Sequence, residues 1–479
     1  MLFPTLDFAL FFFVVFGLAW ALLDRAAPRK AMLLAASYFF YGYWDWRFCF
    51  LLATASVTAY LAGLFIASAR SDLQRRWIIA GALTILLGIL GFFKYYNFFL
   101  DSLGQLLAAL GIERDLPLMV VVLPVGISFF TFQAISYILD VYRGDVAVRR
   151  SLVDLLLYIS FFPQLVAGPI VRAADFLPQL DIRPVLTRAA VTFGLAMILV
   201  GLVKKMIIAN WLATNFVDDV FLTPDIYDSA ALLLAAYGYA IQIYCDFSGY
   251  SDIAIGTAAL LGFHFHVNFR QPYRAASLQD FWRRWHISLS QWLRDYLYKP
   301  LGGSRHGRLN TYRNLLITMF LGGLWHGAAF TFVIWGMLHG VGLALERMVR
   351  GVWTRGRSGT TAVVAGGTGI WRVLAVIATF HFVTVGWIFF RSQDLDTALV
   401  YFSGLAAFTG SLAEITPFRL ALVLIPFAFH FTPEDLTQRI SRRLERVPAF
   451  VLAVLFALGL LIIEWTAVPG TAPFIYFQF

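Results

Sequence analysis

The chain alternates long apolar segments with short polar ones. About 18 or more apolar residues in a row is the length that a helix needs to cross a bilayer. Apolar segments of this kind lie at residues 5–23, 31–48, 49–68, 77–100, 117–139, 152–168, 186–208, 229–262, 314–346, 372–391, 419–432 and 449–467. The pattern predicts an all-α polytopic transmembrane bundle of about ten to thirteen spans or half-spans, with re-entrant and interfacial helices.

Composition supports a membrane protein. Hydrophobic residues make up 60% of the chain and charged residues 14%, whereas soluble domains carry about 25% charged residues. The net charge of +9 falls in loops between apolar segments, so it reports topology rather than nucleic-acid binding. The lipid bilayer is an expected partner and nucleic acid is not. Two cysteines, Cys49 and Cys245, predict neither a disulfide framework nor a cysteine-based metal site.

The charges of the loops predict an orientation, because loops rich in Lys and Arg stay in the cytoplasm. The loops 101–116, 213–228 and 392–418 are acidic and are expected outside. Basic clusters, expected inside, contain Arg70, Arg75 and Arg76; Arg143, Arg149 and Arg150; Arg347, Arg350, Arg355 and Arg357; and Arg439, Arg442, Arg443 and Arg446. Residues 351–370, rich in Gly, Thr and Arg, are expected to form a flexible cytoplasmic loop.

The stretch from His264 to Arg313 is long, basic and rich in aromatic residues. Within it, residues 281–294 read FWRRWHISLSQWLR, with apolar residues at three- and four-residue steps. This spacing predicts one amphipathic helix that lies in the cytoplasmic interface. The turn at 300–303 is expected to end it.

His326 is the most unusual residue of the apolar segment 314–346, in which Glu346 at the end is the one charged residue. An ionisable group at membrane depth is costly unless it faces a cavity or a partner. A hydrogen-bonded packing histidine is the alternative to a functional one. Gly322–Gly323 and Gly327 break the segment, which predicts two helical pieces that meet within the membrane. These glycines leave room for a substrate or another backbone beside the imidazole.

His286 lies on the predicted amphipathic helix. Its position fits either an active-site residue or an interfacial histidine among Trp and Arg side chains. Arg283, Arg284 and Arg294 fit the phosphates of a nucleotide-bearing donor. They fit equally well a role in which they extend to lipid headgroups.

A polar break occurs in the apolar segment 229–262. Asp246 and Asp252 are two carboxylates at membrane depth that need partners, and Ser248 and Tyr250 add hydroxyl groups between them. These side chains could shape a substrate tunnel or tie helices together by hydrogen bonds. The sequence leaves both interpretations open.

Several catalytic motifs are absent. His286 is followed by Ser290 and Gln291 at the fourth and fifth positions, so it is not part of an HxxxD or Hx4D acyltransferase motif. The sequence has no Gly-x-Ser-x-Gly elbow and no Walker A loop. His264 and His266 have no further ligand set nearby in sequence, so no metal site is expected.

Six stretches resemble the membrane-bound O-acyltransferase family and show no departure from its pattern. Within the family, the chain is most similar to the branch that O-acetylates bacterial alginate, and more distantly to the branch that D-alanylates teichoic acid. The stretches are LPVGISF at 123–129, SYILDVYRG at 136–144, AGP at 167–169, DFSGYSD at 246–252, FWRRWHISLS at 281–290 and LGGLWHG at 321–327.

The resemblance implies a fold in which a cytoplasmic funnel meets an extracytoplasmic one at a thin centre. His326 matches the family's catalytic histidine, and His286 matches a second active-site position that other branches fill with Asn, Asp or His. We expect His326 to act as general base, with His286 orienting the thioester carbonyl or sharing the proton. A transient acyl-histidine is an alternative. Further side chains expected to contact substrate are Trp325, Trp285, Arg283, Arg284, Ser290, Asp246, Ser248 and Tyr250.

The resemblance also implies substrates and partners. Acetyl-CoA or another acyl thioester is the expected donor, with no bound cofactor. The expected acceptor is an exported polysaccharide such as alginate, reached with periplasmic acetyltransferase partner proteins from the bacterial inner membrane. We expect one membrane-embedded domain over 1–479, with its catalytic core at about 120–345.

Three other functions compete with this interpretation. A secondary transporter could use Asp246, Asp252, His326 and Glu464 as a relay, although no internal repeat is evident. A D-alanyl or peptidoglycan acyl-transfer protein of the same family is the second. A structural scaffold is the third, and it gives no reason for a histidine between glycines at membrane depth.

Overall fold

The computed structural model describes residues 1–467 apart from residues 2, 113, 115, 118, 120, 356–368 and 412. Every regular element in these residues is a helix, which confirms the all-α prediction. Among them, seven segments are long and apolar enough to cross a membrane: Ala26–Ser68, Asp72–Ala109, Arg188–Leu222, Ser229–Leu260, Phe330–Gly351, Ile370–Arg391 and Ala449–Thr466. Shorter apolar helices cover Leu6–Ala21, Leu395–Ala406 and Pro417–Phe429. The chain is therefore a multi-pass membrane protein.

Contacts divide the chain into two compact units. The first comprises residues 1–194 and 254–266, and the second comprises residues 195–253 and 267–479. Every predicted site residue lies in the second unit. The single domain over 1–479 stays a prediction.

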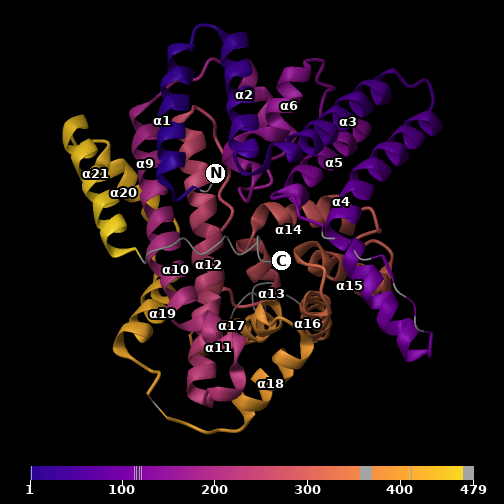
Figure 1. The fold of residues 1–479 in the computed structure, drawn as a ribbon, viewed down its shortest axis with the longest axis vertical. Coiled ribbons are helices and arrows are strands. Elements are labelled where there is room, and N and C mark those ends of the chain that lie inside the picture. The colour runs from indigo at the N-terminus through magenta and orange to yellow at the C-terminus, as the bar shows by residue number, and fades with distance from the viewer. Residues whose placement is uncertain are drawn as a thin grey trace. The chain divides into compact units, whose positions relative to one another are not determined.

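The first unit is a set of packed helices, in which α3 packs against α4, α5 and α6, and α2 packs against α6. Its helices are α1 (Leu6–Ala21), α2 (Ala26–Asp45), η1 (Trp46–Phe48), α3 (Cys49–Ser68), α4 (Asp72–Ala109), α5 (Ile127–Arg143), α6 (Leu152–Ser160), α7 (Phe162–Leu165), α8 (Ala173–Phe176) and η2 (Leu177–Asp181), drawn in indigo to purple in Figure 1. Gly126 precedes α5 with φ 74°, and a Cβ there would lie 2.5 Å from the carbonyl oxygen of Leu165. Only glycine fits this position.

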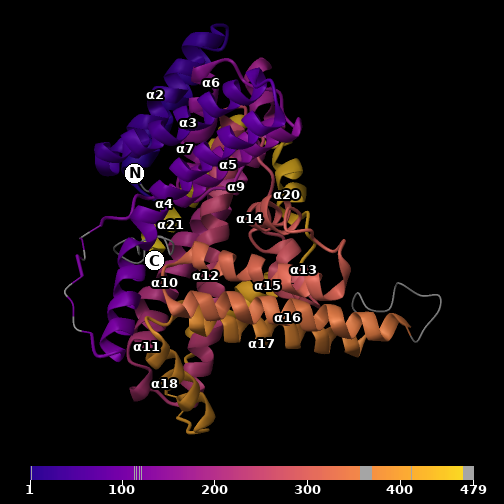
Figure 2. The same ribbon diagram turned by 90° about the vertical axis from the view of Figure 1, so that its right-hand side faces the viewer.

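The second unit holds most of the C-terminal half. Helices α9 and α12 cross the boundary between the units. The helices are α9 (Arg188–Leu202), η3 (Val203–Ala209), α10 (Asn210–Leu212), η4 (Ala213–Val217), α11 (Asp218–Leu222), η5 (Pro224–Ile226), α12 (Ser229–Leu260), η6 (Pro272–Arg274), α13 (Leu278–Arg284), α14 (Ile287–Leu293), η7 (Arg294–Tyr298), α15 (Gly307–His326), α16 (Phe330–Arg355), α17 (Ile370–Arg391), α18 (Leu395–Ala406), α19 (Pro417–Phe429), α20 (Leu436–Leu444) and α21 (Ala449–Thr466). Figure 2 shows α15, α16 and α17 running side by side, as their contacts require.

Several predicted loops are shorter than expected because the helices run on. Helix α4 continues to Ala109 and α16 to Arg355, and the helical segment before residue 223 takes in residues 213–222 of the predicted loop 213–228. The predicted segment 117–139 is wrong at its start, since α5 begins at Ile127. Of the charged residues assigned to loops, Glu113, Asp115 and Arg357 lie outside the described residues. Which loops lie on the cytoplasmic side of the membrane and which lie outside stays a prediction.

Candidate active site

His326 is the last residue of α15, and its side chain is buried. Gly327 follows in extended conformation, and α16 begins three residues later at Phe330. The prediction of two helical pieces is therefore confirmed, with the break directly after the histidine. Apolar rings surround the imidazole: the ring centroids of Trp325, Trp335 and Phe390 lie 5.0, 4.9 and 5.2 Å from its own.

Gly323 on α15 and Gly336 on α16 allow these two helices to pack closely. A Cβ on Gly323 would lie 2.3 Å from the carbonyl oxygen of Phe332, and a Cβ on Gly336 would lie 2.3 Å from that of Met319. Both glycines therefore allow two backbones to touch. The glycines near His326 were expected to make room for a substrate or for another backbone. At Gly323 the structure shows the second, the approach of the α16 backbone.

His286 lies in a sharp break between two short helices. Helix α13 ends at Arg284 and α14 begins at Ile287, while His286 itself has φ 41° and ψ 57°. The prediction of one continuous amphipathic helix over 281–294 is therefore wrong. The side chain of His286 is fully buried, which favours the active-site interpretation over that of an interfacial histidine among Trp and Arg side chains. A left-handed backbone costs a non-glycine residue about 1–2 kcal/mol, so surrounding contacts must hold it.

Asn268 supplies those contacts from the chain segment before α13. Its backbone oxygen accepts a hydrogen bond from the N–H of Ile287 at 2.9 Å. Its Oδ1 accepts bonds from the N–H and the hydroxyl of Ser288, at 3.0 and 2.9 Å. A backbone N–H can only donate, so the atom facing Ser288 is the amide oxygen. The Asn268 side chain is buried, and sequence reasoning did not single it out.

The same amide oxygen fixes the protonation of His286. Nδ1 of His286 lies 3.4 Å from Oδ1 of Asn268. Because that oxygen accepts, Nδ1 carries the proton and the lone pair lies on Nε2. Burial lowers the pKa of His286 to about 3, so the ring is neutral at neutral pH.

One indole links the two predicted catalytic histidines. The ring centroid of Trp325 lies 6.0 Å from that of His286 and 5.0 Å from that of His326. A second indole extends the row, since the Trp335 ring lies 4.9 Å from His326 and 4.9 Å from His339. The structure thus brings His286, Trp325 and His326 together, and their catalytic roles stay predictions.

His339, on α16, is a buried histidine that sequence reasoning missed. Within the described residues, neither of its ring nitrogens has a hydrogen-bond partner, and the same is true of Nε1 of Trp335. Native structures rarely leave buried polar atoms unsatisfied, so such atoms mark sites for water or ligand. The signal that pointed to His326, an ionisable residue within an apolar segment, applies equally to His339.

The other predicted substrate-contacting residues of the segment 281–290 lie in different surroundings. Trp285 is buried against Trp387 and Phe269, with ring centroids 5.0 and 5.1 Å away. Arg283 is exposed, and the hydroxyl of Ser290 donates to the carbonyl of Trp285 at 3.2 Å. Their contacts with substrate stay predictions.

Arg284 is held by two carboxylates. Its guanidinium lies 2.9 Å from Asp280 and 2.8 Å from Glu434, and the hydrogen bond from Arg284 lowers the pKa of Glu434. Arg294 pairs with Asp295 at 2.9 Å. Binding of a donor phosphate was one of the roles considered for Arg284 and Arg294. Their ion pairs reduce the positive charge that they can offer to it.

The polar break of α12 faces the π-helical segment η3. Asp246 pairs with Lys205 at 2.5 Å, and Asp252 pairs with Lys204 at 2.6 Å. Between these pairs, a Cβ on Gly249 would lie 2.8 Å from the backbone oxygen of Gly201.

Helix pairing is therefore the interpretation that the contacts of Asp246 and Asp252 support. Ser248 and Tyr250 are buried beside them, and a role for the four in a substrate tunnel stays a prediction. Sequence reasoning missed Lys204 and Lys205, whose adjacent positive charges in an apolar segment could have indicated partners for the two carboxylates.

A metal site finds no support in the described residues, where no group of three or more His, Cys, Asp or Glu side chains is arranged to bind an ion. His264 and His266 lie in the first unit and are exposed, with ring centroids 5.5 Å apart. Glu464, proposed for a transport relay, is exposed on α21.

The chain is similar to known acyltransferases along most of its length. The family model described as MBOAT, membrane-bound O-acyltransferase family, matches residues 146–383. A protein of Pseudomonas putida named probable alginate O-acetylase AlgI is 38% identical over 495 residues, covering 98% of each chain. The peptidoglycan O-acetyltransferase of Helicobacter pylori is 34% identical over 86% of this chain and 80% of its own. The teichoic acid D-alanyltransferase of Bacillus subtilis is 30% identical over 56% of this chain and 68% of its own.

The helical fold, its apolar spans and the buried histidine pair, taken with these relatives, define a multi-pass membrane acyltransferase. The chain belongs to the membrane-bound O-acyltransferase family, as its motifs predicted.

Proposed function

We propose that the chain passes an acetyl group from a cytoplasmic thioester donor, acetyl-CoA, through the bacterial inner membrane to an exported polysaccharide. The observation that carries the proposal is the buried pair His286 and His326 on either side of Trp325. Relatives named for alginate and for peptidoglycan O-acetylation both modify polysaccharides. Alginate is the acceptor favoured here, because the alginate O-acetylase matches 98% of both chains.

His326 is the proposed general base. It removes the proton from the acceptor hydroxyl while that oxygen attacks the thioester carbonyl carbon. The tetrahedral intermediate then collapses, the carbon–sulfur bond breaks, and the thiolate leaves with the proton that the imidazolium returns. Donor thioester and acceptor alcohol thus become thiol and ester, and the histidine ends in its starting state. An acyl-histidine intermediate remains the alternative route.

The protonation of His286 favours one of its two proposed roles. With the proton on Nδ1 directed to Asn268, Nε2 of a neutral His286 accepts a hydrogen bond and does not donate one. His286 is therefore better suited to share the proton of the acceptor hydroxyl than to donate a hydrogen bond to the thioester carbonyl. The indole N–H of Trp335, whose ring lies 4.9 Å from His326, is a suitable donor for the developing oxyanion.

The acceptor side is proposed to involve periplasmic acetyltransferase proteins that complete the transfer. Acidic residues at the starts of α11 and α18, Asp219 and Asp394, suit docking such partners. The D-alanyl alternative has less support, since its relative matches only 56% of this chain.

Sealed vesicles of known sidedness test the proposal. Acetyl-labelled acetyl-CoA is supplied to inside-out and right-side-out membranes that contain the chain, its periplasmic partners and alginate on the opposite side. We expect label in alginate only when the donor contacts the cytoplasmic face, and none with His326→Ala. Label that depends on neither the sidedness nor His326 contradicts the proposal.

A further inference from the structure

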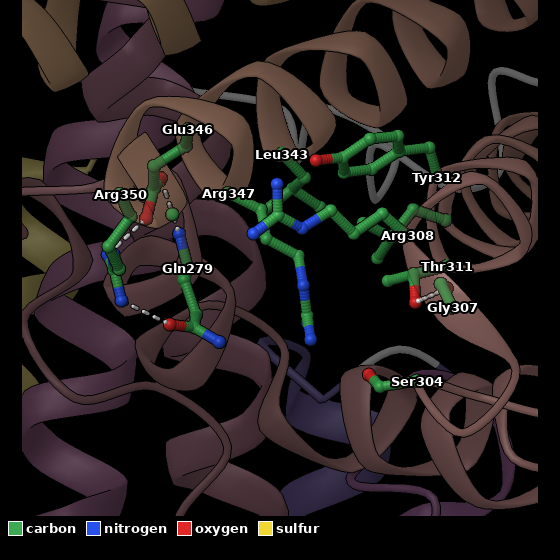
Figure 3. Close-up of a pocket in the computed structure, with 12 residues that line it drawn as sticks. Gln279, Ser304, Gly307, Arg308, Thr311, Tyr312, Leu343, Glu346, Arg347 and Arg350 are labelled. Atoms are coloured by element: carbon green, nitrogen blue, oxygen red, sulfur yellow. Dashed lines mark hydrogen bonds and ion pairs between the residues drawn. The ribbon is translucent and has the colours of Figure 1, made fainter. Parts of the chain in front are cut away.

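A cavity of about 500 Å³ opens beside the start of α15, away from the histidine pair. Its walls come from the start of α13, the start of α15 and the end of α16, and Figure 3 shows their side chains. The cavity lies entirely within the second unit. The proposed mechanism assigns no role to any of its residues.

Arginines dominate the charge of this cavity. Arg308, Arg347 and Arg350 line it, together with one carboxylate, that of Glu346. Figure 3 shows the side chains of Arg308 and Arg347 extending into the space between α15 and α16.

The carboxylate of Glu346 is already fully engaged. It accepts hydrogen bonds from the backbone N–H groups of Leu278 and Gln279, at 2.8 and 3.2 Å, which caps the start of α13. It also pairs with Arg350 at 2.5 Å, and Arg350 donates to the side chain of Gln279 at 2.9 Å. Glu346 therefore neutralises Arg350 and helps to hold the wall in place.

Arg308 and Arg347 are left with their charges uncompensated. Both are exposed, and neither forms an ion pair with any residue that the structure describes. Two guanidinium groups facing one cavity repel each other, so an anion between them is stabilised by both. The hydroxyls of Ser304 and Tyr312 also line the cavity and can donate hydrogen bonds.

We infer that this cavity binds a phosphate-bearing ligand through Arg308 and Arg347. Guanidinium groups bind phosphate oxygens through paired hydrogen bonds, and two of them match the double negative charge of a phosphate ester. The start of α15 adds the partial positive charge of its free N–H groups. A volume of about 500 Å³ also holds the organic group that carries the phosphate.

Two ligand sources share this chemistry: the nucleotide end of a soluble thioester donor, and the headgroup of an anionic phospholipid. Arg308 lies near the opposite end of α15 from His326, about 27 Å of helix away at 1.5 Å per residue. The cavity is therefore a binding site and not part of the reacting centre. This inference does not require the proposed function, since it concerns binding alone.

Binding to the purified full chain tests the inference. The probes are coenzyme A in titration calorimetry, and bilayer nanodiscs with or without phosphatidylglycerol, whose retention is measured by native mass spectrometry. The double variant Arg308→Gln/Arg347→Gln is compared with Arg305→Gln, which changes a neighbouring exposed arginine outside the cavity. Single variants at Arg308 and Arg347 show whether both contribute.

We expect the double variant to weaken binding of one probe by about tenfold or more, with intermediate loss in each single variant and none in Arg305→Gln. Loss of coenzyme A binding identifies the nucleotide as ligand, and loss of phosphatidylglycerol retention identifies the lipid. Unchanged binding of both probes overturns the inference, and so does an equal loss in Arg305→Gln. Repeating the titration in His326→Ala separates this result from that of the transfer assay.

Discussion

The Oδ1 atom of Asn268 lies 3.4 Å from Nδ1 of His286 and accepts the backbone N–H of Ser288 at 3.0 Å. One buried amide thus holds both the ring and the following backbone of a residue in left-handed conformation. The geometry of the histidine pair therefore depends on a residue that precedes His286 by 18 positions and contacts it only in the folded chain.

Asn268→Ala is expected to lower kcat by up to about a hundredfold, because small displacements of a catalytic group have effects of this size. The KM for the donor should stay close to that of the parent chain, since Asn268 positions His286 and contacts no proposed donor group. Steady-state acetyl transfer measures both constants. Asn268→Asp keeps the acceptor oxygen and should restore most of the rate, and Asn215→Ala, at an exposed position, is the control. Full activity in Asn268→Ala argues against the positioning role.

The buried ion pair between Lys205 and Asp246 is expected to matter for stability. Removing one partner leaves a buried charge, at a cost of about 3–5 kcal/mol, so Lys205→Met and Asp246→Leu should each lower the unfolding temperature in detergent. The double variant should regain much of the loss, since both charges are gone. Arg76→Ala breaks the exposed pair with Asp72 and should change little. A double variant no more stable than the singles contradicts the pairing of α12 with η3.

Two adjacent glycines provide a matched test of the α15–α16 contact. Gly323→Ala brings a Cβ to 2.3 Å from a backbone oxygen, whereas Gly322→Ala meets only the flexible side chain of Leu293 at 3.3 Å. Gly323→Ala should therefore cost about 1–3 kcal/mol or more, and Gly322→Ala much less. Thermal unfolding in detergent and the amount of protein in the membrane measure the difference. Equal effects of the two substitutions would show that the helices do not approach closely at Gly323.

His286 gives a prediction for the dependence of stability on pH. Its pKa falls from 6.5 to about 3 on burial, so below pH 6.5 the unfolded chain takes up a proton that the folded chain does not. The stabilisation present above pH 6.5 is therefore lost as the pH falls toward 3, by at most about 1.4 kcal/mol per pH unit. His286→Asn removes this contribution, and its unfolding temperature should fall less steeply between pH 6.5 and about 5. Contributions of other histidines cancel in the comparison, so parallel curves rule out a buried neutral His286.

The sequence predicted what depends on local pattern. Apolar segments identified the spans, and an ionisable residue in an apolar segment identified His326. Contacts between residues distant in sequence could not be predicted from the local pattern. The periodicity of 281–294 favoured one helix, but Asn268 folds back onto Ile287 and Ser288 and breaks it at His286. Likewise, the partners of Asp246 and Asp252 are lysines on η3, which only the packing of α12 reveals.

The cavity at the start of α15 could not be predicted either, because its walls come from three helices that meet only in the folded chain. From the sequence, Arg283, Arg284 and Arg294, which lie within eight residues of His286, fitted either donor phosphates or lipid headgroups. The structure pairs Arg284 and Arg294 with carboxylates, and it brings Arg308 from the start of α15 together with Arg347 from the end of the next helix, α16.

The most direct test of the account is the rate of acetyl transfer by His326→Ala, measured with labelled acetyl-CoA in membranes and compared with His266→Ala. Both variants must first show the expression and unfolding temperature of the parent chain. We predict that His326→Ala lowers the rate by about 10²–10⁴-fold, the usual contribution of a general base. His266→Ala, which changes a histidine whose side chain is 71% exposed, should keep the full rate. A folded His326→Ala protein that transfers acetyl groups at the parental rate contradicts the assignment of His326 as the catalytic base.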